Sequence, residues 1–341
     1  MGVNISKIIP KKEINLSDLK GKTIAIDAYV TLYQFLTTIR QPDGTPLKDS
    51  NGNITSHLSG LFYRNINLLQ AGIKPVYVFD GKPPELKSSE IEKRKEAKQI
   101  AEQQYKKAKE DDDIAAMKKY SSRTVKITDE IITQSKEILT ALGIPIIQAP
   151  SEGEAEAATL ARQGKVYAAA SQDYDTLLYA TPYLIRNLTS PKRKKLPSGL
   201  YIDIKPELID FQQVLTELNI EKDQLICLAI LVGTDYNPGG VKGLGQQRAL
   251  QIVQQYKYPV EIFKAVQEKY DFIFEWQEIF RLFQDYQTNQ IGEIEFKKPD
   301  EEKIKQILTR HEFSEARISS ALQKLQDIEN SKKQKGLSDF F

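Results

Sequence analysis

The chain has 341 residues, 40% hydrophobic and 28% charged, and this composition excludes collagen-like, low-complexity and wholly disordered proteins. Its 48 Lys and Arg residues almost balance its 46 Asp and Glu residues, so any nucleic-acid binding must come from local separation of charge. A single cysteine, Cys227, and two histidines argue against a zinc site with nitrogen and sulfur ligands and favour a reducing, cytoplasmic environment.

Short apolar runs rich in β-branched residues predict buried strands in the first half of the chain. They occupy residues 23–26, 75–79, 144–147 and 166–170. Helical patterns alternate with them over 56–71, over 128–142 and from Ser151 onward. This alternation predicts an α/β fold whose mainly parallel central sheet is flanked by helices.

Residues 85–126 interrupt that pattern. Twelve of these 42 residues are Lys or Arg and nine are Asp or Glu, which leaves few apolar side chains to bury. Such a composition is typical of a solvated helical excursion or a disordered insertion. The functional alternative is a mobile helical arch over an active site.

The last third of the sequence has mainly helical patterns, and it ends in a polar, charged stretch. The predicted helices span 222–232, 247–256, 259–269 and 300–310. The final residues, SKKQKGLSDFF, are expected to form an extended tail. No apolar run approaches the ~20 residues of a membrane span, so no membrane association is expected.

Acidic residues follow the predicted strands where each strand ends. This carboxyl edge is where open α/β sheets bind their ligands. A further acid follows an apolar helix and can reach the same edge. The whole set is Asp27, Asp80, Glu152, Glu154, Asp173, Asp175 and Asp235.

Each acid taken singly also has a structural explanation. An Asp after a strand often caps the next helix, and Ser151 with Glu154 has the spacing of a capping box. Seven convergent acids are harder to explain in this way, because their repulsion raises their pKa values unless cations hold them ionised. Oxygen-only clusters suit Mg²⁺ or Mn²⁺, and two such ions about 4 Å apart promote phosphodiester hydrolysis.

A glycine-rich turn lies between two predicted helices in the sequence GGVKGLGQQRAL, and it contains Gly240, Gly243 and Gly245. Such a turn presents backbone N–H groups and a helix N-terminus to a phosphate. Together with the helices 222–232 and 247–256 it forms a helix–turn–helix hairpin that can grip a duplex backbone without base contacts.

Basic residues gather near the proposed acidic site. A run of charge usually forms a solvated face, but beside a metal centre it can hold a polyanion. Tyr33 is placed to stack on a base, the alternative being a tyrosine of the core. The basic residues are Lys82, Lys87, Lys93, Arg94, Lys95, Lys98 and the run PKRKK at 191–195.

These motifs resemble those of the archaeal and eukaryotic flap endonucleases, XPG-like nucleases that trim 5′ flaps in DNA replication and repair. The resemblance extends nearly from end to end, in the family's order and spacing. Its motifs are MGV, AIDA, YVFDGKPP, APSEGEAEA, SQDYD, LVGTDY and GVKGLG. The absence of a long basic extension after Phe341 makes the archaeal members the better match.

The resemblance implies a role for each matching residue. The seven acids correspond to the family's metal ligands, for two Mg²⁺ ions that Mn²⁺ can replace. Lys87 and Arg94 correspond to its basic catalytic residues at the base of the arch. Tyr33 corresponds to its stacking tyrosine and Gly2 to its N-terminal glycine. One K⁺ ion at the helix–two-turn–helix element is also implied.

The chain end, from Gln334 to Phe341, resembles the peptide by which replication proteins bind the sliding clamp (PCNA). In this peptide a leucine follows a glutamine by three residues, and two aromatic residues begin three residues after the leucine. This spacing lets one short turn present apolar side chains to a groove. The alternative is that this tail docks back on its own domain. The clamp-binding residues are Gln334, Leu337, Phe340 and Phe341.

We therefore expect a monomeric nuclease that cleaves branched DNA at the base of 5′ flaps, with 5′–3′ exonuclease activity. One alternative is a relative acting mainly as an exonuclease or on bubbles; another is a catalytically silent, clamp-bound DNA scaffold. We expect a single nuclease domain over residues 1–330 and a flexible tail over 331–341. Within the domain we expect an N-terminal nuclease part (1–84), the helical arch (85–126), an internal nuclease part (127–235), the duplex-binding element (222–256) and a helical C-terminal part (257–330).

Overall fold

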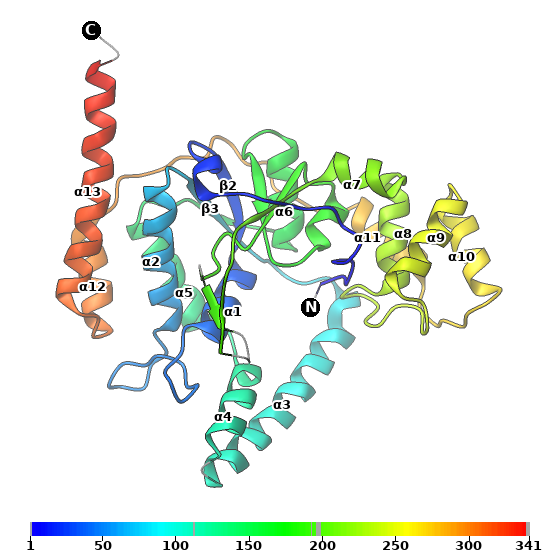
Figure 1. The fold of residues 1–341 in the computed structure, drawn as a ribbon, viewed down its shortest axis with the longest axis horizontal. Helices are drawn as coiled ribbons and strands as arrows, with labels where there is room; N and C mark the ends of the chain where they lie inside the picture. Colours follow the sequence, from blue (N-terminus) through cyan, green and yellow to red (C-terminus); the bar gives the residue numbers. More distant parts are fainter. Residues whose placement is uncertain (1, 112, 192, 196–198, 339–341) are drawn as a thin grey trace.

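The computed structural model describes residues 2–111, 113–191, 193–195 and 199–338. Figure 1 shows a central sheet with helices on both sides, two helices that project from the body and a helical lobe at the opposite end from α13. The strands are β1 (Lys12–Glu13), β2 (Thr23–Asp27), β3 (Lys74–Phe79), β4 (Ile146–Gln148), β5 (Ala168–Ala170), β6 (Tyr183–Arg186), β7 (Arg193–Lys195), β8 (Tyr201–Asp203) and β9 (Glu207–Asp210).

The helices occupy most of the remaining chain. The α-helices are α1 (Ala28–Thr38), α2 (Ser56–Gln70), α3 (Ser88–Glu110), α4 (Ile114–Ser121), α5 (Asp129–Ala141), α6 (Gly153–Arg162), α7 (Phe211–Leu218), α8 (Lys222–Val232), α9 (Gln246–Gln255), α10 (Pro259–Gln267), α11 (Trp276–Gln284), α12 (Glu301–Arg310) and α13 (Glu315–Ser338). Short 3₁₀ turns are η1 (Leu16–Leu19), η2 (Glu85–Lys87), η3 (Ser122–Thr124) and η4 (Asp175–Tyr179).

Within the described residues, seven strands form one sheet in the order β1-β9-β6-β5-β2-β3-β4. The strands from β6 to β4 are parallel to their neighbours. β9 runs antiparallel to both β6 and β1. The prediction of a mainly parallel α/β sheet is confirmed, with a mixed edge that the sequence did not indicate. β7 and β8 form a separate antiparallel ribbon.

The central strands bury side chains on both faces of the sheet. Ile24 and Ile26 pack on the side of α1, α2 and α5, whereas Ala25 between them packs toward α6. In β3, Tyr77 and Val78 divide between the two faces in the same way. Since successive side chains of a strand point to opposite faces, only nearly continuous apolar runs fit this position.

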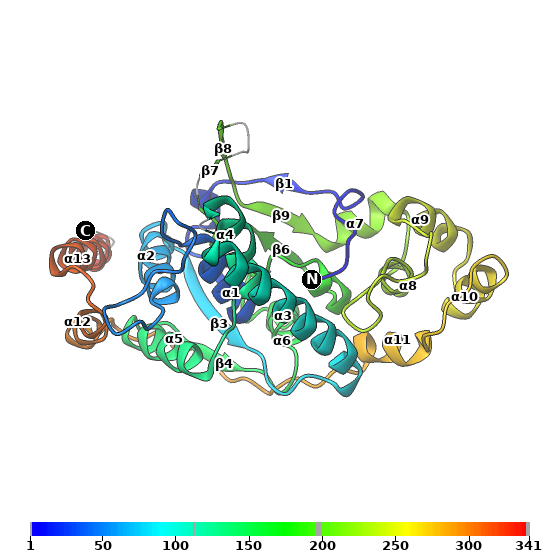
Figure 2. The ribbon, with the colours of Figure 1, turned by 90° about the horizontal axis from the view of Figure 1, so that it is seen from below.

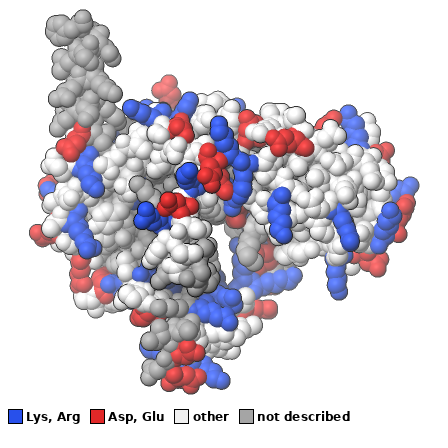
Figure 3. Space-filling view, viewed as in Figure 1, with Lys and Arg blue, Asp and Glu red and all other residues white. Residues whose placement is uncertain are grey.

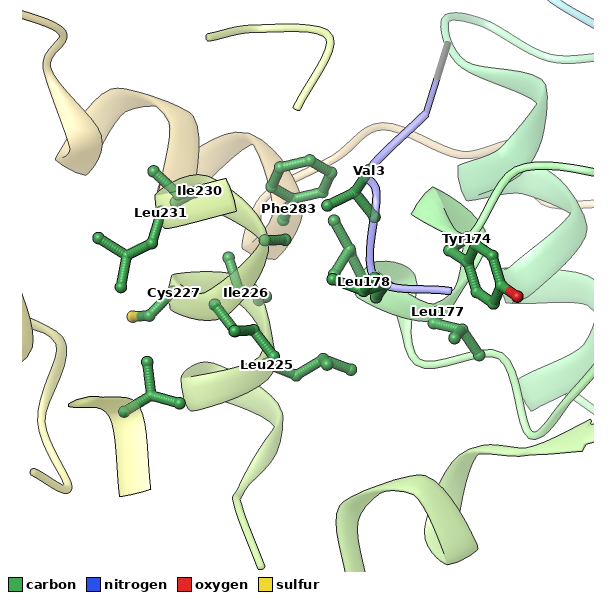
Figure 4. Close-up of a cluster of buried hydrophobic side chains, with 14 of the residues drawn as sticks. Val3, Tyr174, Leu177, Leu178, Leu225, Ile226, Cys227, Ile230, Leu231 and Phe283 are labelled. Carbon is green, nitrogen blue, oxygen red and sulfur yellow. The ribbon is translucent and has the colours of Figure 1, made fainter. Parts of the chain in front are cut away.

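The remaining helices extend the molecule at its two ends. α12 packs on α5, and α13 packs on α2. At the other end, the apolar helix α8 is surrounded by α9, α10 and α11 (Figure 2). Leu225, Ile226, Ile230 and Leu231 of α8 join Val3 and η4 residues in one buried cluster (Figure 4).

The charged segment 85–126 is helical, and the disordered alternative is wrong for its described residues. α3 and α4 pack against each other and project from the body (Figure 1). Ala101 and Ala108 of α3 are buried, so small apolar side chains provide a packing face on α3. The high proportion of charged residues in the segment gave no sign of this face. Lys126 at the end of the segment pairs with Glu102 at 2.7 Å.

Residues 286–300, here called the strap, connect α11 to α12 without helix or strand. The N–H groups of Lys297 and Asp300 donate to the carbonyl oxygens of Gly143 and Ala141, at 3.1 and 2.7 Å. The N–H of Asn289 donates to the buried Glu156 carboxylate at 2.9 Å. The strap thereby joins the loop after α5 and the helix α6.

Two predictions about regular structure need correction. The strands predicted at 144–147 and 166–170 are shorter and begin two residues later, at Ile146 and Ala168, where their paired registers with β3 and β2 begin. The expected extended tail is also wrong as far as Ser338, since α13 continues to that residue. The residues KKQK at 332–335 have high helix propensity. No helix in the described ranges is long and apolar enough to cross a membrane.

Candidate active site

The seven predicted acids lie on the elements that end at the carboxyl edge of the parallel strands. Asp27 is the last residue of β2, Asp80 follows β3, and Asp173 and Asp175 follow β5. We call the whole set the acid cluster: Asp27, Asp80, Glu152, Glu154, Asp173, Asp175 and Asp235. Asp27 also caps α1, accepting from the N–H of Val30 at 3.0 Å, so the capping explanation is correct for this residue.

The start of α6 differs from the predicted capping box. The N-cap residue is Glu152, not Ser151, and its side chain makes no capping hydrogen bond. The carboxylate of Asp80 takes this place, because its Oδ1 accepts from the N–H of Gly153 at 2.7 Å. A Cβ on Gly153 would lie 2.6 Å from that oxygen, so glycine allows the close approach. Gly153 was not predicted as a site residue, although a glycine between two acids at a helix start is its signal in the sequence.

The N-terminal segment lies directly against the acid cluster. The N–H of Val3 donates to Asp175 Oδ1 at 2.5 Å. A Cβ on Gly2 would lie 2.7 Å from Cβ of Asp173 and 2.9 Å from Asp175 Oδ1. The predicted site residue Gly2 is therefore beside the acids, and no larger residue fits there without displacing them.

The acids raise one another's pKa values. Burial, followed by the charge of Asp80, raises the pKa of Asp27 well above its usual range. Burial and then Asp175 do the same to the pKa of Glu154. Burial raises the pKa of Asp80 to about 6 and that of Asp175 to about 7. Raised pKa values mean that ionising these carboxyls together is unfavourable, and nearby cations relieve this cost.

Two basic side chains supply part of this compensation. Lys87 Nζ lies 2.8 Å from Glu152 Oε2 and 3.4 Å from Asp235 Oδ2, and Arg94 Nη2 lies 2.9 Å from the same Asp235 oxygen. Although burial alone would raise the pKa of Asp235, Lys87 and Arg94 hold it below its usual range. Arg94 also pairs with Glu90, four residues earlier on α3, which was not among the predicted site residues.

The chemistry of the acid cluster fits hard divalent cations. In the described part of the chain, no group of three or more acidic, His or Cys side chains is already arranged to hold an ion. The donors are nevertheless all carboxylate oxygens, and those of Asp27, Asp80, Glu154 and Asp175 have raised pKa values that a cation would lower. This donor set suits Mg²⁺ or Mn²⁺ better than a softer metal.

The predicted DNA contacts are on several different elements of the chain. Tyr33 on α1 is 43% exposed, so its interpretation as a core tyrosine is wrong. Arg193 of the basic run pairs with Asp203 across the β7–β8 ribbon at 3.0 Å, and Lys192 lies outside the described residues. Lys and Arg side chains are also spread over the lobe on the face shown in Figure 3.

The glycine turn joins α8 to α9 as predicted. Gly240 and Gly243 have positive φ angles of 56° and 84°, which side chains rarely adopt. Val241 and Leu244 are buried in the cluster around α8, so the turn is anchored between its glycines. Gly245 is the N-cap of α9, and a Cβ there would meet nothing within 4 Å.

The proposed clamp-binding residues are only partly described. Gln334 and Leu337 belong to the last turns of α13. Phe340 and Phe341 lie outside the described residues.

Comparison with protein-family models gives two matches. Residues 1–101 match the XPG N-terminal domain, and residues 143–235 match the XPG I-region. Flap endonuclease 1 of Pyrococcus abyssi is 51% identical over 343 residues, covering 100% of this chain and 98% of its own. Flap endonuclease 1 of Aeropyrum pernix is 47% identical over 331 residues, covering 95% and 94%.

Solved structures agree with this similarity. Flap endonuclease-1 from Methanococcus jannaschii aligns with a TM-score of 0.76 and 40% identity, over 97% of this chain and 100% of that one. The catalytic core of Rad2 in complex with DNA substrate aligns with a TM-score of 0.71 over 95% and 100%, but at 23% identity it shows a shared fold alone.

Proposed function

Because the chain belongs to the flap endonuclease 1 family of XPG nucleases, we propose that its acid cluster is the centre at which the phosphodiester at the base of a 5′ flap is hydrolysed. The protein is a nuclease, a hydrolase of DNA replication and repair. Its family implies dependence on a divalent metal ion. The number of ions, two by our proposal, follows from the size of the acid cluster.

One observation carries this assignment to residues. Four acids with raised pKa values share a single edge of the sheet with Lys87, which pairs with two further members of the cluster. Divalent ions bound there would activate water and stabilise the leaving oxygen. A DNA-binding scaffold needs no such cluster, since carboxylates beside a phosphate weaken binding.

The chain's own residues have separate tasks in this proposal. Lys87 and Arg94 neutralise charge that develops on the phosphate oxygens during cleavage. Asp80 fixes the start of α6 and thereby orients Glu152 and Glu154. Gly2 leaves the acids uncovered at the N-terminus, because it has no side chain to place over them.

The elements around the acid cluster would hold the DNA. Tyr33 stacks on a base, and α3 and α4 form the arch beside the single-stranded flap. The turn with Gly240, Gly243 and Gly245 grips the duplex backbone, with one K⁺ ion shared between turn and phosphate. The exposure of Gly245 and the open space around its Cα support this role, because a phosphate can approach the backbone closely there.

The tail would bind the sliding clamp through Gln334, Leu337, Phe340 and Phe341. Gln334 and Leu337 lie in the last turns of α13, at the opposite end of the molecule from the helical lobe (Figure 1), and this position supports the proposal. The 5′–3′ exonuclease activity would use the same acids, since both substrates present a phosphodiester next to a 5′ end.

Cleavage of labelled double-flap, nicked-duplex, bubble and single-stranded substrates, each with Mg²⁺ and with EDTA, tests the function. Cleavage at the flap junction that EDTA abolishes is the expected result. Asp80→Ala should lower the single-turnover rate by several orders of magnitude while the flap stays bound, because the carboxylates act mainly in the transition state. Near-normal cleavage by Asp80→Ala would refute the assignment of the site.

A further inference from the structure

We propose that Arg186 is a positioning residue that fixes the loop between β5 and η4, and with it the placement of Asp173 and Asp175 for metal binding. The inference rests on the metal-dependent hydrolysis proposed above. Arg186 is absent from the motifs that suggested the active site, and it contacts that loop from the neighbouring strand β6.

The guanidinium of Arg186 contacts the loop at two positions that alternate with the acids. Its Nε donates to the carbonyl oxygen of Gln172 at 3.1 Å, and its Nη1 donates to the hydroxyl of Tyr174 at 2.6 Å. The guanidinium carbon also lies 4.3 Å from the centre of the Tyr174 ring. Because Asp173 lies between the two contacted residues and Asp175 follows them, fixing the contacts fixes both carboxylates.

Strand topology explains why an arginine of β6 reaches this loop. Arg186 ends β6, which is parallel to β5, with Ala170 opposite Ile185. The residue after this pair therefore lies at the same carboxyl edge as the loop. On its other side Arg186 faces Glu207 of the antiparallel β9.

The arginine is itself held in place. Its Nη1 pairs with Glu207 Oε2 at 3.0 Å, and Glu207 Oε1 pairs with Lys11 at 2.8 Å. The side chains of Arg186 and Glu207 are only 18% and 17% exposed, so water competes little for these contacts. Because Glu207 holds the guanidinium of Arg186 in place, that guanidinium can in turn hold Gln172 and Tyr174 in place.

Tyr174 is the element through which the loop is fixed to the rest of the molecule. It is 4% exposed and belongs to the apolar cluster with Leu177 and Leu178. Figure 4 shows its hydroxyl directed away from the α8 side chains of that cluster. The ring is thus held by apolar contacts and the hydroxyl by Arg186.

These contacts require an arginine. The N–H groups of the guanidinium donate to a carbonyl, a hydroxyl and a carboxylate at once, and the flat face of the guanidinium lies against the Tyr174 ring. A lysine keeps the charge but cannot make the same set of contacts. Residues that orient metal ligands from behind typically affect metal affinity or activity 10–100-fold when changed.

The test compares Arg186→Lys with Arg162→Lys and with the parent protein. Arg162 is a matched control, because its guanidinium lies 5.5 Å from the centre of the Tyr286 ring but contacts no acid-cluster loop in the described contacts. Calorimetric titration with Mn²⁺ alone, without DNA, measures metal affinity directly. The Mn²⁺ dependence of single-turnover flap cleavage separates weakened metal binding from a lowered maximal rate.

Arg186→Lys should weaken Mn²⁺ binding about 10-fold and raise the Mn²⁺ concentration for half-maximal cleavage equally. Cleavage at saturating Mn²⁺ should return close to the parent rate. Tyr174→Phe, which removes only the hydroxyl contact, should shift both values in the same direction by less. Arg162→Lys should leave both unchanged.

Unchanged Mn²⁺ affinity in Arg186→Lys would overturn the inference, even if the melting temperature fell, since the role would then be structural only. An equal loss in Arg162→Lys would also overturn it. If Arg186→Lys does not fold, Tyr174→Phe decides by the same two measurements. A parent protein that binds no Mn²⁺ would instead overturn the proposed function.

Discussion

Replacing Asp175 with asparagine should stabilise the metal-free protein at pH 8. Burial, with a further contribution from Asp173 and Asp235, raises the pKa of Asp175 from 3.8 to about 7. When the pKa of an acid is higher in the folded state than in the unfolded state, its protonated form stabilises the folded protein at low pH. This stabilisation is lost as the pH rises through the folded pKa. Asparagine is uncharged and keeps the oxygen that accepts from the N–H of Val3.

The expected magnitude follows from the separation of the two pKa values. Each pH unit of separation corresponds to about 1.4 kcal/mol, so the ionised Asp175 should lower the unfolding free energy by about 4 kcal/mol at pH 8. At pH 5 the folded carboxyl is protonated and only the unfolded one is ionised. The same calculation then gives a loss of unfolding free energy of less than about 2 kcal/mol at pH 5.

Urea unfolding of parent and Asp175→Asn protein in EDTA, at pH 5 and pH 8, measures both values. Asp271→Asn is the control, because Asp271 is exposed and lies between α10 and α11 of the helical lobe. Adding Mg²⁺ at pH 8 should reverse the order of stability, since an ion bound only by the folded state stabilises the parent. A variant no more stable than the parent at pH 8 in EDTA would refute the electrostatic reasoning.

Three further predictions concern the DNA and clamp contacts. Lys87→Ala and Arg94→Ala should lower the single-turnover cleavage rate far more than Lys106→Ala, an exposed lysine of α3; equal losses would indicate only general attraction of DNA. Gly245→Val should lower the melting temperature only slightly, through the loss of a good N-cap residue at an open site, yet clearly weaken duplex binding in a gel-shift series; the same loss with single strands would contradict the duplex grip. Deleting residues 334–341 should preserve flap cleavage and abolish calorimetric binding to the sliding clamp; unchanged affinity would place the clamp contact elsewhere.

The buried parallel strands and the apolar helices were predictable from the sequence. β2 and β3 are continuous apolar runs, and α8 begins and ends at the predicted residues, Lys222 and Val232. β6 and β9 were missed, because they are short and depend on pairing with other strands, β6 with β5 and β9, and β9 with β6 and β1. Local patterns carry no information on such pairing.

The acid cluster was predictable because each of its members follows an element that ends at the same edge. Its internal contacts were not. The pairing of Lys87 with Glu152 spans 65 residues, and the bond from Gly153 to Asp80 spans 73. Only the folded arrangement shows that α6 is capped by Asp80, the acid that follows β3, rather than by Ser151.

The strap has a consequence for the order in which the protein completes its fold during synthesis. The carbonyl oxygens of Ala141 and Gly143 and the carboxylate of Glu156 acquire their partners from residues 289–300. Because a nascent chain is made from its N-terminus, these groups can form their hydrogen bonds only after more than a hundred further residues have left the ribosome. The helix that carries Glu152 and Glu154 is therefore secured late, and a partly synthesised chain has all seven acids without a finished enzyme.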